Sequence, residues 1–119
     1  MLALLIALGV LHHTRNHFHM HPNETIFLKT AQTFIQSGLR DAGYIFLNSD
    51  DGWLSPNRSA AGDLIPMPDQ FPSGIAALTE KLHNLGFQFG IYGCASETTC
   101  GSREGSLYHE LHDAQQYAT

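Results

Sequence analysis

The stretch "SGLRDAGYIFLNSDDGW", residues 37–53, contains the joint between a helix and a strand, together with the residues that follow that strand. Gly38 is placed to end a helix, and the aromatic and branched residues 44–48 are typical of a buried strand. The stretch "HNLGFQFGIYG", residues 83–93, repeats the order of helix end, glycine and aromatic strand. A repeated joint of this kind predicts an α/β fold in which helices connect the strands of a parallel sheet.

The rest of the chain continues this alternation. Periodic apolar residues predict helices over 23–38, 73–86 and 106–118. Asn23 is expected to cap the first helix, and Gly86 to end the second. The predicted strands are 44–48 and 87–93, and the apolar run Leu2–Leu11 is expected to be either the first strand or a degraded signal region. The order is then strand and helix, three times over.

Length and composition fit one small globular domain or part of a larger one. The chain has 119 residues, of which 43% are apolar, and a formal net charge of -5. This acidic balance argues against nucleic acids and anionic membranes as partners, because both require a basic patch. Leu2–Leu11 is also too short to span a bilayer, which takes about 20 residues. Sequons at Asn23 and Asn57 would accept glycans in a secreted protein.

In parallel α/β folds the chemistry lies at the carboxyl ends of the strands, which directs attention to the residues after 48 and after 91. Asp50, Asp51 and Trp53 follow the second strand. Carboxylates accept hydrogen bonds from neighbouring hydroxyls and an indole packs on a pyranose ring, so the group suggests sugar recognition; a solvated turn is the alternative. Adjacent residues of an extended segment point to opposite faces, so the two aspartates do not suit the acid/base pair of a retaining glycosidase, whose carboxyl groups lie about 5–5.5 Å apart.

Tyr92 and two cysteines follow the third predicted strand. Tyr92 can offer its ring or hydroxyl to the same pocket, and Cys94 and Cys100 lie in the loop after it. The cysteines fit either a local disulfide or two free thiols, because no CxxC metal spacing is present. Nothing in the sequence fixes a histidine partner that would make either thiol a nucleophile.

Five of the eight histidines fall within "LHHTRNHFHMHPNE", residues 11–24. His17, His19 and His21 alternate, and on a strand they would share one face, which is a pattern that could bind a transition metal. Such a site also needs a carboxylate or cysteine at fixed geometry and a second shell that orients the ligands. A resemblance to a known family accounts for most of this stretch in another way, so we expect neither a metal nor another cofactor.

Many segments of the chain resemble the melibiase-type α-galactosidases of glycoside hydrolase family 27 in order and spacing. They are "NHF" at 16–18, "NE" at 23–24, "GLRDAGY" at 38–44, "DDGW" at 50–53, "FPSGIAALTEKLHNLGFQFGIYG" at 71–93, "TC" at 99–100, "GS" at 105–106 and "HELHDAQQYA" at 109–118. The resemblance implies the N-terminal part, about three βα units, of a (β/α)8 barrel with open sheet edges. It also implies a secreted or lysosomal protein and retaining hydrolysis of terminal α-galactosides.

The resemblance also implies roles for individual residues. Asp50 and Asp51 match the pair that holds galactose hydroxyls, Trp53 matches the aromatic residue beside that pair, and Tyr92 matches a residue lining the pocket. Cys100 matches a pocket-wall cysteine that is normally bonded to a partner further along the chain.

The sequence departs from the family pattern at three places. The family's first strand carries a Met-Gly-Trp stretch, where this chain has "VLHHTR" at 10–15. Met20 and Gly52 occupy the positions of two cysteines that the family joins in a disulfide. In the family, the nucleophilic aspartate and the acid/base aspartate lie at positions that would come after Thr119.

We therefore expect residues 1–119 to form part of an α-galactosidase-like glycosidase domain that keeps a portion of the galactose subsite and lacks both catalytic aspartates. Alone, such a chain should not hydrolyse α-galactosides. A galactose-binding protein without catalysis is the second hypothesis, and a histidine-cluster metal protein is the third.

Overall fold

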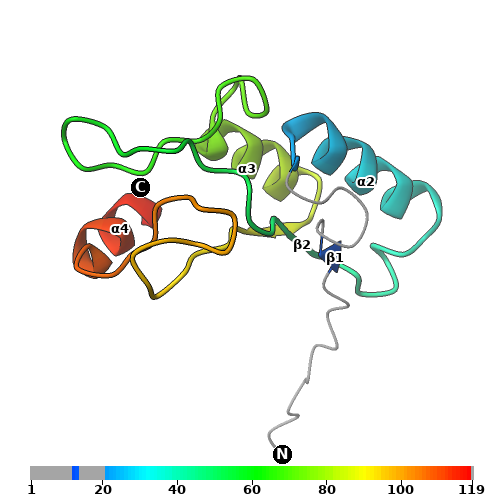
Figure 1. The fold of residues 1–119 in the computed structure, drawn as a ribbon. Coiled ribbons are helices and arrows are strands. Elements are labelled where there is room, and N and C mark those ends of the chain that lie inside the picture. Colours follow the sequence, from blue (N-terminus) through cyan, green and yellow to red (C-terminus); the bar gives the residue numbers. More distant parts are fainter. Residues whose placement is uncertain (1–11, 14–20, 119) are drawn as a thin grey trace, which may run out of the picture.

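The computed structural model describes residues 12–13 and 21–118, in which strands and helices alternate (Figure 1). The elements are β1 (His12–His13), α2 (Glu24–Gln36), β2 (Phe46–Asn48), α3 (Ile75–Asn84), β3 (Gln88–Gly90) and α4 (Glu110–Tyr117). The strands form one parallel sheet in the order β1-β2-β3, so β1 and β3 are its edges. The predicted alternation and the open parallel sheet are confirmed. The strand or signal region expected over Leu2–Leu11 lies outside the described residues.

Helix α2 begins and ends where local sequence signals predict. The side chain of Asn23 accepts a hydrogen bond from the Ile26 N–H at 3.0 Å, which satisfies one of the free donors of the first turn. Gly38, with φ of 78°, follows the last turn in the left-handed conformation that glycine adopts without strain. Phe27 and Ala31 are the buried residues of this helix, so they mark the face that packs against the rest of the protein.

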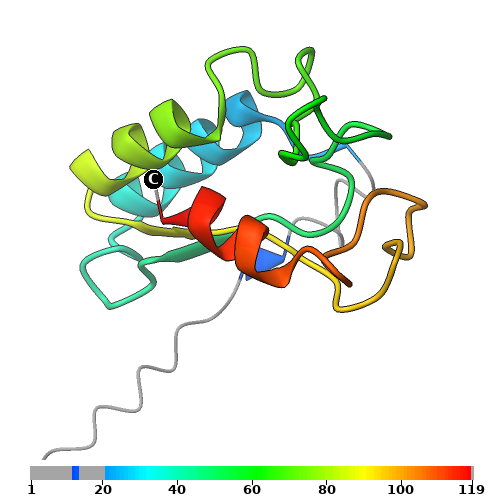
Figure 2. The ribbon, with the colours of Figure 1, turned by 90° about the vertical axis from the view of Figure 1, so that its left-hand side faces the viewer.

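Helices α2 and α3 lie next to each other over one face of the sheet (Figure 2). Leu78 and Leu82 of α3 are fully buried, as are Leu47 of β2 and Phe87 just before β3. These side chains fill the space between helices and strands, and their burial is the main apolar contribution to the stability of this layer. Ile75, the first residue of α3, and Leu85, its C-cap, are only partly buried.

The regular elements are shorter than predicted, for local reasons. Strand β2 begins at Phe46 and not at 44, and β3 runs over Gln88–Gly90 and not over 87–93. The ladder ends where Asn48 pairs with Gly90, so the residues after Gly90 belong to a loop and not to the strand. Helix α4 begins at Glu110 and not at 106, because Tyr108 has φ of 68° and this conformation interrupts a helix.

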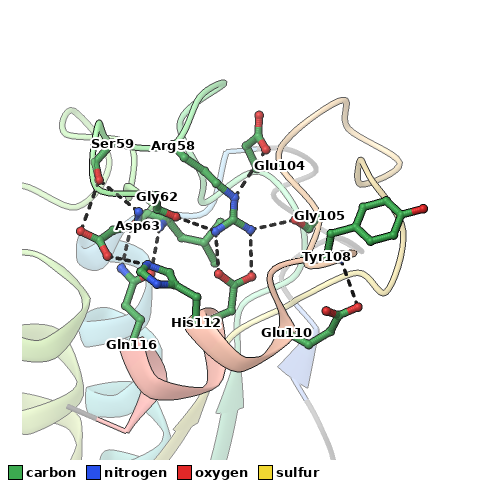
Figure 3. Close-up of polar contacts among 12 residues, drawn as sticks. Arg58, Ser59, Gly62, Asp63, Glu104, Gly105, Tyr108, Glu110, His112 and Gln116 are labelled. Carbon is green, nitrogen blue, oxygen red and sulfur yellow. Dashed lines mark hydrogen bonds and ion pairs between the residues drawn. The ribbon is translucent and has the colours of Figure 1, made fainter.

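The long loop between β2 and α3 is docked onto α4 by a polar network centred on Arg58 (Figure 3). The two Nη atoms of Arg58 donate to the two carboxylate oxygens of Asp113 at 2.6 and 2.8 Å. They also donate to the carbonyls of Gly62 and Gly105, each at 2.8 Å. One guanidinium therefore joins three segments of the chain, and the fork geometry of arginine makes this possible.

Two further contacts bind the same loop to α4. The side-chain amide of Gln116 accepts from the Leu64 N–H at 2.9 Å and donates to its carbonyl at 2.8 Å. Nε2 of His112 lies 2.9 Å from Oδ1 of Asp63. Asp113 is the buried residue of α4, while Leu111 is 74% exposed. Polar contacts, and not an apolar stripe, therefore hold α4 in place.

Replacing Asp113 by Asn should destabilise the fold strongly. The side chains of Arg58 and Asp113 are only 9% and 2% exposed, and without the Asp113 carboxylate the buried guanidinium keeps, among the described residues, only the more exposed carboxylate of Glu104, at 3.5 Å from its Nε. Breaking a buried ion pair in this way costs up to about 3–5 kcal/mol. The midpoint of urea unfolding measures the loss. Asp41→Asn is the matched control, because Asp41 pairs with Arg40 at a side chain that is 72% exposed and should contribute less than about 1 kcal/mol. Equal shifts in the two variants would contradict this assignment.

The same pair predicts how stability depends on pH. The hydrogen bond from Arg58 lowers the pKa of Asp113 in the folded chain. The contribution of Asp113 is therefore fully present above the unfolded pKa, about 3.9, and is lost as the pH falls through the folded value. Between neutral pH and strong acid, the free energy of unfolding should therefore fall less for Asp113→Asn than for the unaltered chain. If the free energy of unfolding falls equally with pH in the two proteins, Asp113 does not contribute in this way.

Candidate functional site

A small cavity of about 190 Å³ lies at the carboxyl ends of β2 and β3. Its lining residues are Asn48, Ser49, Asp50, Gly90, Ile91 and Tyr92. The cavity forms because both strands end at the same edge of the sheet and their next residues diverge. Two of the residues predicted from the sequence, Asp50 and Tyr92, are thus brought together at the predicted edge.

Asp50 and Asp51 have different environments. The carboxylate of Asp50 accepts from the Asp51 N–H at 2.7 Å, which fixes its orientation at the cavity. Asp51 is 2% exposed and is not among the cavity residues. The two adjacent side chains therefore have different surroundings, one at the cavity and the other in the protein interior.

The Asp51 carboxylate anchors the loop that follows β3. Its Oδ1 accepts from the N–H of Gly52 at 2.8 Å and from the hydroxyl of Thr99 at 3.0 Å. Its Oδ2 accepts from the N–H of Gly101 at 2.7 Å. These donors compensate for burying a negative charge, and they fix the segment around Cys100 beside the end of β2.

Trp53 lies in the core and not at the cavity. It is 2% exposed, and its indole N–H donates to the Tyr92 carbonyl at 2.8 Å. The indole therefore fixes the backbone of a cavity residue from within the protein. Its ring lies beside a different hollow, between α3 and α4, and the structure does not bring it to the small cavity where a sugar ring was expected to pack on it.

Tyr92 and Cys94 lie next to each other after β3. Partial burial, together with a hydrogen bond to Cys94, raises the pKa of Tyr92 to about 12. Its hydroxyl therefore remains protonated at neutral pH and can donate a hydrogen bond. Cys94 lies 3.1 Å from the Ser96 hydroxyl, whose hydrogen bond lowers the pKa of the thiol.

Cys94 and Cys100 are both free thiols, so the local disulfide left open by the sequence is not formed. Cys100 is exposed and is not among the cavity residues. Its place near the site depends on its neighbour Gly101, which Asp51 binds.

Asn48 and Gly90 also line the cavity and were not predicted from the sequence. A signal for Asn48 was available: it lies two positions before Asp50, and alternate residues of a strand share a face. Gly90 becomes a neighbour of Asn48 only through the register of β2 and β3, which the sequence does not define.

No group of three metal-binding side chains occurs among the residues that the structure describes. His21 is exposed, whereas His17 and His19 lie outside the described residues. Within 21–118, no helix is long and apolar enough to cross a membrane.

Comparison with known proteins gives one consistent family. The melibiase family model described as alpha galactosidase A matches residues 14–119. Alpha-galactosidase 3 of Arabidopsis thaliana is 43% identical over 104 residues, which are 87% of this chain and 24% of that protein.

Two solved structures extend the similarity to three dimensions. The crystal structure of alpha-galactosidase I from Mortierella vinacea has a TM-score of 0.86 at 37% identity and covers 89% of this chain and 27% of its own. The α-galactosidase of Saccharomyces cerevisiae, solved with raffinose, has a TM-score of 0.85 at 38% identity, with coverages of 89% and 23%. The chain thus spans about a quarter of the length of these relatives.

Replacing Asp51 by Asn should release the loop after β3. The amide keeps the size of the side chain but presents one donor where three donors now converge, at a cost of about 1–3 kcal/mol. Amide hydrogen exchange at Gly101 should accelerate in Asp51→Asn. Thr99→Ser, which retains the hydroxyl, is the matched control and should exchange like the unaltered chain. Unchanged exchange in Asp51→Asn would show that other contacts hold the loop.

Proposed function

Because the chain belongs to the melibiase family of alpha galactosidases, we propose that it forms the first part of an α-galactosidase catalytic barrel and carries part of the galactose subsite. The observation that carries this proposal is the cavity at the carboxyl ends of β2 and β3, lined by Asp50 and Tyr92. Both residues match family positions at the sugar pocket. A carboxylate that accepts and a protonated phenol that donates suit the hydroxyls of a sugar.

The sheet supports the barrel part of this proposal. β3 is an edge strand, and beside it a hollow of about 950 Å³ lies between α3 and α4. Phe89, Ile91, Leu64 and Ile75 give this hollow much of its apolar lining. A further strand pairing with β3 would satisfy the open edge and cover these side chains, as the next βα unit of a (β/α)8 barrel does.

For the complete domain we propose retaining hydrolysis of terminal α-D-galactosyl residues by double displacement. In this reaction one carboxylate attacks the anomeric carbon, and a second protonates the leaving oxygen and then activates water. We assign both carboxylates to positions outside residues 1–119. The buried, fully bonded Asp51 is a poor candidate for either role, because all of its described donors come from the protein. No cofactor takes part in this chemistry.

A second candidate function is galactose binding without catalysis. It is favoured by the cavity itself, which needs only Asp50, Tyr92 and their strand neighbours and is present within these 119 residues. Hydrolysis and binding assays on the same purified chain distinguish the two functions.

The chain should bind galactose weakly and hydrolyse nothing. Trp53 is the single tryptophan and is bonded to Tyr92, so its fluorescence should change in a saturable manner as galactose fills the cavity. Asp50→Asn should weaken binding by about tenfold or more, since a hydrogen bond to a charged group contributes about 1.5–3 kcal/mol. Asp41→Asn, which removes an exposed carboxylate elsewhere, is the matched control.

Two results would contradict these expectations separately. The absence of a saturable change at high galactose concentration would reject the sugar site. Turnover of an aryl α-galactoside above the buffer rate would reject the assignment of the catalytic carboxylates to positions outside this chain.

We also propose that the protein is secreted, as its family resemblance implies. Asn57 of the sequon "NRS" is exposed, whereas the Asn23 side chain is engaged as a helix cap. Expression through a secretory pathway should therefore add a glycan at Asn57, and Asn57→Gln should remove its mass. Asn84→Gln, at an exposed asparagine outside any sequon, is the control. Identical masses for the unaltered chain and Asn57→Gln would leave the proposed route without this support.

A further inference from the structure

Asn48 ends β2 directly opposite Gly90, which ends β3. A Cβ atom built on Gly90 would collide with Oδ1 of Asn48 and would also press on its carboxamide carbon. The Asn48 side chain therefore lies across the Gly90 backbone, in space that only glycine leaves open. Both residues line the small cavity.

The strand geometry places Asn48 below Asp50 on one face. Alternate residues of a strand share a face, and the two neighbours of Asn48, Leu47 before it and Ser49 between it and Asp50, are both buried. Tyr92 follows two residues after Gly90 and also lines the cavity. The residues around the cavity thus include one with a carboxylate, one with a phenol and one with a carboxamide.

The Asn48 carboxamide is available for a ligand. Among the residues that the structure describes, it has no hydrogen-bond partner, although it is partly buried. The oxygen and nitrogen of this carboxamide are not fully buried and have no partner among the described residues to displace, so a ligand hydroxyl in the cavity can bond to them directly. By contrast, the carboxylate of Asp51 next to the cavity is fully used by protein donors.

We propose that Asn48 is a sugar-contacting residue that helps to determine specificity in this cavity, with Gly90 making room for its carboxamide. A sugar hydroxyl can donate its proton to Asp50 while its oxygen accepts from the Asn48 amide. Such a donor and acceptor pair selects a hydroxyl of one position and orientation and rejects an epimer that lacks it, because both protein groups would then lose their partner. This inference rests on the sugar-binding function proposed above.

A double-mutant cycle on the full 119-residue chain tests the inference. The galactose dissociation constant is measured by titration for the unaltered chain, Asn48→Ala, Gly90→Ala and the double variant. Asn48→Ala should weaken binding about fivefold, as expected for one neutral hydrogen bond. Gly90→Ala should weaken it at least as much, because the added methyl displaces the carboxamide. In the Asn48→Ala background, Gly90→Ala should have no further effect.

Controls separate a ligand contact from a structural role. Asn84→Ala, at an exposed asparagine at the end of α3, should leave galactose binding unchanged. Asn48→Asp, which keeps the size of the side chain but loses the donor, should weaken galactose binding and reduce the preference for galactose over glucose. Unfolding midpoints are recorded for every variant.

Three outcomes would overturn the proposal. If Asn48→Ala and Asn48→Asp lower the unfolding midpoint but leave the galactose dissociation constant unchanged, Asn48 is a structural residue only. Additive effects of Asn48→Ala and Gly90→Ala would show that Gly90 does not act by making room for the carboxamide. If the unaltered chain binds no galactose, both this inference and the sugar-binding function fail, whereas loss of the Asn48 effect alone leaves that function intact.

Discussion

The buried guanidinium of Arg58 is the contact on which the arrangement of the second half of the chain depends. It joins the loop after β2, the loop after β3 and helix α4, through Gly62, Gly105 and Asp113. The loop after β2 contributes Trp53, Leu54, Leu64 and Phe71 to the buried core, whereas no residue of that core comes from the loop after β3, and α4 exposes Leu111 and Tyr117. Apolar burial is therefore insufficient to position α4 and the loop after β3. A bidentate ion pair provides a defined distance and orientation instead, because the planar fork of arginine matches a carboxylate.

The cavity depends on this polar support. Loops at the carboxyl ends of parallel strands have no sheet partner, so their positions must come from side chains. Asp51 binds the loop after β3 through Thr99 and Gly101, while Trp53 fixes the Tyr92 carbonyl. Consequently, of the four residues 50–53, only Asp50 lines the cavity. Asp51 and Trp53 instead stabilise the loop after β3 beside it. The position of Asp50 at the cavity thus depends on the hydrogen bonds that Asp51 and Trp53 make with the protein.

Features that depend on neighbours in the sequence were predictable. Asn23 caps α2 and Gly38 ends it because both act within a single helical turn. Asp50 and Tyr92 were placed at one edge because parallel strands end together. Contacts that depend on three-dimensional arrangement were not predictable: Arg58 and Asp113 are 55 residues apart. The burial of Trp53 was missed for the same reason, since its partner is a backbone carbonyl brought close only by the fold.

The pairing of Asn48 with Gly90 suggests how a specific pocket can be built with few residues. In a parallel sheet a side chain at the end of one strand has its nearest neighbour in register on the next strand. A glycine at that position lets the first side chain lie against the neighbouring backbone, whereas a Cβ atom there would collide with the carboxamide and force it to move. The depth of the cavity is then set by the missing side chain of Gly90 as much as by the carboxamide of Asn48. The strand register, which places Asn48 opposite Gly90, therefore determines that the Asn48 carboxamide would be available to a sugar bound at Asp50.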